Sequence, residues 1–136
     1  MGIPTLISTS TASDSSSIDI TSGIDSTYDE YMFVCTDINA ATDAASFTFQ
    51  VNATDDPGGG YDTSLITSTY FTAYHYENNS SASIGMSGAT FILEQQADFQ
   101  FITQSQGNGA DESAAGILHI FNPSSTTYVK HFYARS

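Results

Sequence analysis

Residues 45–53 (ASFTFQVNA) alternate strictly between apolar side chains at odd positions and polar side chains at even positions. Successive side chains of a β-strand point to opposite faces, so this alternation gives a strand one apolar and one polar face. Residues 97–101 (ADFQF) and 18–20 (IDI) repeat the pattern over shorter stretches. The period of two predicts antiparallel strands with one face in a core and the other in water.

Other segments are apolar at both parities. These are residues 31–35 (YMFVC), 115–121 (AGILHIF) and 127–133 (TYVKHFY), while residues 66–76 carry aromatic side chains at odd and even positions. Strands of this kind are either central in a sheet or use their outer face to meet another subunit. Stretches rich in Pro, Gly, Asn and Ser separate the segments and predict turns.

These patterns predict an all-β fold, an antiparallel β-sandwich with a jelly-roll-like arrangement. An immunoglobulin-like sandwich has the same alternating strands and turns, so the strand order stays open. A chain of 136 residues fits one domain. We expect residues 1–17, which are rich in Ser and Thr, to form an N-terminal arm or first strand, and residues 18–136 to form the single domain.

The charge balance excludes several functions. Fifteen acidic residues stand against two basic ones, Lys130 and Arg135, and the formal net charge is −13. Nucleic acids and anionic lipids are bound by clustered cations, so we expect neither a nucleic acid nor a membrane as partner. The N-terminus lacks a basic region followed by an apolar stretch, which predicts synthesis in the cytoplasm without a signal peptide.

One acidic loop could bind a metal ion. Asp55, Asp56 and Asp62 flank a Pro-Gly-Gly-Gly turn and, with backbone carbonyls, could supply oxygen ligands to calcium. The alternative is a solvated loop, because the spacing matches no EF-hand. We expect no other cofactor.

The remaining reactive side chains form no recognisable catalytic motif. His75, His119 and His131 lie in predicted strands without metal-binding spacing, and the single Cys35 excludes an intrachain disulfide. Paired carboxylates could cleave a polysaccharide, but the chain has no Trp to stack on a sugar. The sequence therefore predicts a protein that is not an enzyme.

Several longer segments resemble a known family. They are residues 23–31 (GIDSTYDEY), 36–43 (TDINAATD), 47–50 (FTFQ), 71–80 (FTAYHYENNS) and 117–132 (ILHIFNPSSTTYVKHF). Over most of residues 5–135 the chain resembles uncharacterised virion structural proteins of marine tailed bacteriophages, especially those that infect cyanobacteria. Such proteins continue with further strands after the segment that corresponds to residues 133–135, so we expect the sheet of this chain to be incomplete at its C-terminal end.

The resemblance implies a structural protein of the virion, as a capsid-decorating, fibre or tail-associated β-domain. It implies no catalytic or binding residues. We expect the domain to form a homo-oligomer and to dock to other virion proteins by burying aromatic strand faces. The anchors that we expect are Tyr31, Phe33, Tyr70, Tyr74, Phe132 and Tyr133. The alternatives are a receptor- or glycan-binding module at a fibre tip, dependent on calcium, and a polysaccharide-degrading enzyme.

Overall fold

The computed structural model describes residues 3–53, 61 and 64–136, and all regular structure in them is β. The strands are β1 (Glu30–Ile38), β2 (Thr48–Phe49), β3 (Ile66–Thr67), β4 (Phe71–His75), β5 (Ala82–Met86), β6 (Glu94–Gln96), β7 (Gln100–Phe101), β8 (Ala114–Phe121) and β9 (His131–Arg135). Every strand pair is antiparallel. The prediction of an antiparallel all-β fold is therefore confirmed.

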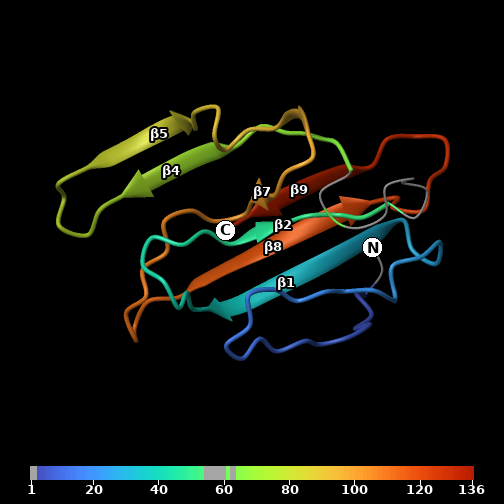
Figure 1. Cartoon of the computed structure of the whole chain (residues 1–136), viewed down its shortest axis with the longest axis horizontal. Coiled ribbons are helices and arrows are strands. Elements are labelled where there is room, and N and C mark those ends of the chain that lie inside the picture. Colours follow the sequence, from blue (N-terminus) through green and yellow to red (C-terminus); the bar gives the residue numbers. More distant parts are fainter. Residues whose placement is uncertain (1–2, 54–60, 62–63) are drawn as a thin grey trace.

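The main sheet has the order β1-β8-β9, and three two-stranded ladders, β2–β7, β3–β6 and β4–β5, complete the fold (Figure 1). In the main sheet Phe33 lies opposite Leu118, which lies opposite Ala134. Directly opposed residues share a face of an antiparallel sheet. One face of the main sheet, the core face, therefore carries this row together with the row of Tyr31, Ile120 and Phe132.

The core lies between this face and the short ladders. The ring of Phe132 meets that of Phe49 in β2 at 5.1 Å between centroids, edge to face. Among the described residues, the buried apolar ones are Tyr31, Ile66, Leu93, Ile102 and Leu118. The amide of buried Gln100 is satisfied by the hydroxyl of Ser68 and by backbone carbonyls. The core formed by the described residues is thus small.

Two segments form less strand than their alternation predicts. In residues 45–53 only Thr48–Phe49 pairs, with one isolated bridge at Ala45. The carbonyl of Phe47 accepts from two consecutive amides, those of Ile102 and Thr103, which breaks the regular ladder. Residues 18–20 form no strand, and the side chains of Ile18 and Ile20 are exposed because no neighbouring strand pairs with them.

The last strand starts later than the sequence predicts. Residues 127–130 precede β9, and the side chains of Tyr128 and Val129 are exposed. The hydroxyl of Ser125 accepts hydrogen bonds from the amides of Thr127 and Tyr128 and so holds a turn. Local side-chain bonds of this kind compete with strand pairing.

Residues 3–29 contain no helix or strand, so the irregular N-terminal segment extends beyond the predicted arm of residues 1–17. Its end is tied to the sheet at Asp25. The hydroxyl of buried Tyr31 accepts from the amide of Asp25 and lies 3.0 Å from its carboxylate. The amide of Thr27 also donates to this carboxylate, at 2.8 Å. Hydrogen bonds from Thr27 and then from Tyr31 lower the pKa of Asp25 below 3.8.

We predict that Tyr31→Phe raises the pKa of Asp25 part of the way back to 3.8, because the donor Thr27 remains. A lowered carboxyl pKa contributes stability that is present above the unfolded-state value and is lost as the pH falls through the folded-state value. The tether should therefore weaken only below pH 3.8. An NMR titration of the Asp25 carboxyl carbon checks this, and an unchanged pKa in Tyr31→Phe would contradict it.

Candidate interaction surfaces

The second face of the main sheet points away from the core. The registers of β1, β8 and β9 place nine side chains on it in three rows of three, and we name this set the outer face. The first row is Glu30, Phe121 and His131, the second is Met32, His119 and Tyr133, and the third is Val34, Ile117 and Arg135.

The outer face is apolar and open. Val34 is 59% exposed, Tyr133 57% and Met32 45%. Side chains of this kind are ordinarily covered when they stand together on a sheet, since burying each one contributes about 1.5–3 kcal/mol. Within the described part of the chain, however, all three remain uncovered. The outer face is therefore a candidate for contact with another protein.

His119 stands at the centre of the outer face. Its Nδ1 lies 2.6 Å from Oε1 of Glu30, and its ring lies 6.2 Å from that of Phe121 and 6.3 Å from that of Tyr133, between centroids. The carboxylate fixes the orientation of the imidazole. The outer face holds no serine or cysteine, so this pair has no such nucleophile to activate. The arrangement holds the His119 ring in place on the outer face.

A second open face lies on the β4–β5 hairpin, which projects beside the main sheet (Figure 1). Phe71 pairs with Met86, and Ala73 pairs with Ile84, so these four side chains share one face. Phe71 is 60% exposed, Met86 68% and Ile84 72%. On the opposite face the rings of Tyr74 and Tyr76 lie 5.3 Å apart. The hairpin thus presents further apolar surface.

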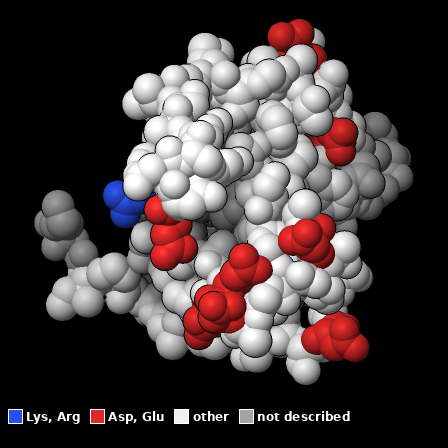
Figure 2. All heavy atoms as spheres, turned by 90° about the vertical axis from the view of Figure 1, so that its left-hand side faces the viewer, with Lys and Arg blue, Asp and Glu red and all other residues white. Residues whose placement is uncertain are grey.

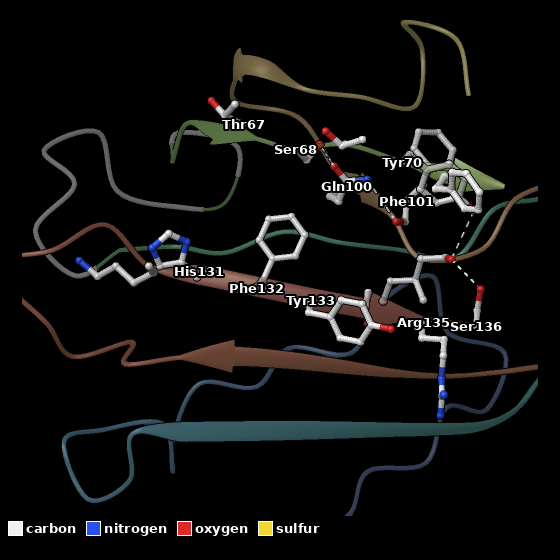
Figure 3. Close-up of a pocket in the computed structure, with 15 residues that line it drawn as sticks. Thr67, Ser68, Tyr70, Gln100, Phe101, His131, Phe132, Tyr133, Arg135 and Ser136 are labelled. Atoms are coloured by element: carbon white, nitrogen blue, oxygen red, sulfur yellow. Dashed lines mark hydrogen bonds between the residues drawn. The ribbon is translucent and has the colours of Figure 1, made fainter. Parts of the chain in front are cut away.

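A cleft of about 490 Å³ runs between β9 and the segments 67–71 and 100–102 (Figure 3). Lys130 and Arg135, the two basic residues of the chain, belong to its lining. The hydroxyls of Tyr70 and Ser136 both donate to the carbonyl of Ile102. Much of the polar lining is thus already used within the chain.

Acidic groups avoid the core. All acidic residues in the described ranges are exposed. On the face shown in Figure 2, acidic groups are scattered over the surface and a basic group lies at the margin. In the main sheet, the outer face contains a single acidic side chain, Glu30, and the single arginine. The outer face therefore differs in charge from the rest of this acidic chain.

The residues predicted to anchor an interface fall into three environments. Tyr31, Phe33 and Phe132 lie on the core face, and Tyr31 is only 4% exposed. Tyr70 is half-buried and stacks on Phe91. Tyr74 and Tyr133 are exposed, on the hairpin and the outer face respectively, and are the two that a partner can reach directly.

The other predicted site residues give no assembled site. Asp55, Asp56 and Asp62, the candidate calcium ligands, lie outside the described residues. His75, His119 and His131 are separated over the hairpin and the outer face. Cys35 is half-buried, and this burial raises the pKa of its thiol.

Sequence reasoning missed several exposed apolar residues. They are Met32, Val34 and Phe121 on the outer face and Ile84 and Met86 on the hairpin. The sequence nevertheless carried a signal for the outer face and for the hairpin. The runs 31–35 and 115–121 are apolar at both parities, and residues 82–86 (ASIGM) alternate with a period of two.

Over residues 3–53, 61 and 64–136, no three His, Cys, Asp or Glu side chains come together in a way that could hold a metal ion. The same ranges contain no helix that is long and apolar enough to span a membrane. No protein-family model, no curated protein and no solved structure matches the chain.

Proposed function

We propose that the chain is a structural protein of a phage virion, a capsid-decorating, fibre or tail-associated β-domain that self-associates and docks to other virion proteins. It performs no catalysis and carries no cofactor. It acts by burying apolar sheet faces between subunits.

The observation that carries this proposal is the surface of the isolated chain. Its accessible area is 10078 Å², whereas a folded monomer of 14.5 kDa has about 6,900 Å². The excess exceeds the total area of about 1,600 Å² that a standard protein interface buries. Large apolar side chains contribute to it: among the described residues, five are buried and twenty-one are exposed. Such a chain gains stability from subunit contacts.

The proposal extends to the arrangement of the sheets in layers. We propose a reduced, jelly-roll-like sandwich, in which the main sheet is one layer and the short ladders on its core face are the beginning of the other. The contact of Phe49 with Phe132 supports this assignment of layers. Neighbouring subunits would supply the cover that the short ladders leave incomplete.

The proposal is tested by sedimentation velocity of the purified chain at low and high salt. We expect a discrete oligomer that is favoured by salt, because screening reduces the repulsion between copies of net charge −13. Mass spectrometry of purified particles of the encoding phage should find the chain among the virion proteins. A monomer at every concentration, or absence from the particles, would contradict the proposal.

The cleft along β9 favours one second candidate, a glycan-binding module at a fibre tip. Its lining combines aromatic rings, hydroxyls and the basic residue Lys130, which suits an acidic saccharide. The structural function remains the better supported, because much of the polar lining is engaged within the chain. A glycan array separates the two: saccharide binding that Lys130→Ala abolishes would favour the module.

A further inference from the structure

We propose that two copies of the chain associate through the outer face, in a two-fold symmetric contact that pairs Glu30 of each copy with Arg135 of the other. This inference rests on the proposed self-association and names its surface, its partner and its pairing. The partner is a second copy of this chain. Three observations support it: the charge of the outer face, the positions of its charged corners and the match of its apolar side chains.

The charge of the outer face permits two acidic molecules to meet there. With histidine neutral, Glu30 and Arg135 cancel, so the nine residues are formally neutral in a chain of net charge −13. The other acidic residues of the described chain lie outside this set. Contact through the outer face therefore brings together two surfaces that are each formally neutral, with no net like-charge repulsion between them.

The two charged groups occupy opposite corners of the three-by-three grid. Glu30 begins β1 in the first row, and Arg135 ends β9 in the third row. The side chain of Arg135 extends from β9 across β8 towards β1 (Figure 3). Among the described residues, no carboxylate lies within ion-pair distance of Arg135, and Glu30 pairs with His119 of its own chain. Arg135 is thus available to a partner.

The two corners are exchanged by a two-fold axis that lies in the plane of the contact. This axis is perpendicular to the diagonal from Glu30 to Arg135. Each Glu30 then faces Arg135 of the second copy, and both ion pairs form at once. The same operation brings Phe121 over Tyr133 of the second copy. Met32 comes over Ile117, so that apolar groups meet apolar groups. The strands of the two sheets cross steeply, as in orthogonal sheet packing.

The size of the outer face determines how strongly we expect the two copies to associate. A standard interface uses about 20 to 30 residues on each side, whereas the outer face supplies nine. We therefore expect a dissociation constant in the micromolar range. Contact through the outer face is then one of several contacts in an assembly.

Charge exchange in the full chain tests the inference by sedimentation equilibrium across the micromolar range. Glu30→Arg and Arg135→Glu should each weaken association about tenfold or more, because each places like charges opposite one another twice. The double variant Glu30→Arg/Arg135→Glu restores the opposite charges and leaves the net charge at −13. We expect it to recover association to within about threefold of the unaltered chain.

Matched controls separate this pairing from a change of net charge. Glu94→Arg changes the charge as Glu30→Arg does, and Lys130→Glu changes it as Arg135→Glu does, but neither residue is on the outer face. Neither control should weaken association as much as its matched variant. Near-UV circular dichroism verifies that each variant is folded.

The outcomes distinguish the inference from the proposed function. Weakening in both single variants with recovery in the double variant supports the inference. Association that persists in the single variants but is lost in Ile84→Asp of the hairpin overturns the inference and leaves the proposed function standing. A chain that stays monomeric at all concentrations overturns both the inference and the proposed self-association.

Discussion

Replacing Leu118 by alanine is expected to lower the free energy of unfolding by about 3 kcal/mol. Leu118 is 5% exposed and occupies the centre of the core face, between Phe33 of β1 and Ala134 of β9. Shortening it removes apolar burial and leaves a cavity that strands paired on both sides cannot close. Because only five apolar residues are buried in the described chain, one truncation removes a large part of the core.

Urea unfolding followed by circular dichroism measures this loss. Val34→Ala is the matched control, since Val34 is 59% exposed on the other face of the same sheet. In the monomer, this replacement should lower the free energy of unfolding by less than about 0.5 kcal/mol. Equal losses in the two variants would contradict the assignment of core and outer faces. Both are measured at protein concentrations low enough to avoid association.

The two long strands were predictable because their sequences carry enough apolar residues to specify pairing alone. The runs 31–35 and 115–121 became β1 and β8, which form the centre of the main sheet. Their apolar character at both parities also pointed to a subunit contact, and the structure leaves Met32, Val34 and Phe121 open on the outer face. Which parity faces the core was not predictable, because both are apolar.

The alternating segments were less predictable because strand formation there depends on the partner. Residues 45–53 have the clearest alternation of the chain, yet only Thr48–Phe49 pairs, because residues 102 and 103 share one carbonyl acceptor. In residues 127–130 the hydroxyl of Ser125 decides the conformation. Hydrogen bonds of this kind are set by geometry that periodicity does not contain.

The candidate surface, too, depends on strand pairing that the sequence pattern does not contain. Tyr31 looked like an interface anchor because it is aromatic, but the register puts it on the core face, where its hydroxyl bonds to Asp25. Glu30 and Arg135 are 105 positions apart in the sequence, and only the order β1-β8-β9 puts them on one face. Pairing of distant strands is therefore the information that the sequence alone did not supply.

Gly116→Val is expected to lower the free energy of unfolding by about 2–3 kcal/mol. Gly116 lies on the core face of β8, where two other segments approach its backbone closely. A Cβ at this position would lie 3.2 Å from the carbonyl oxygen of Arg135 and 3.2 Å from Cγ2 of Ile102. Valine adds two further methyl groups beyond that Cβ, so either β9 or the segment that holds buried Ile102 must move.

Ala115→Val supplies the control, because it puts the same side chain one residue earlier, where the strand is exposed. It should change the free energy of unfolding by no more than about 0.5 kcal/mol, since β-branched residues suit strands. Urea unfolding of both variants gives the comparison. If Gly116→Val were tolerated and Ala115→Val were not, β8 would present its opposite side to the core. The outer face, and with it the proposed pairing of Glu30 with Arg135, would then be assigned to the wrong side of the sheet.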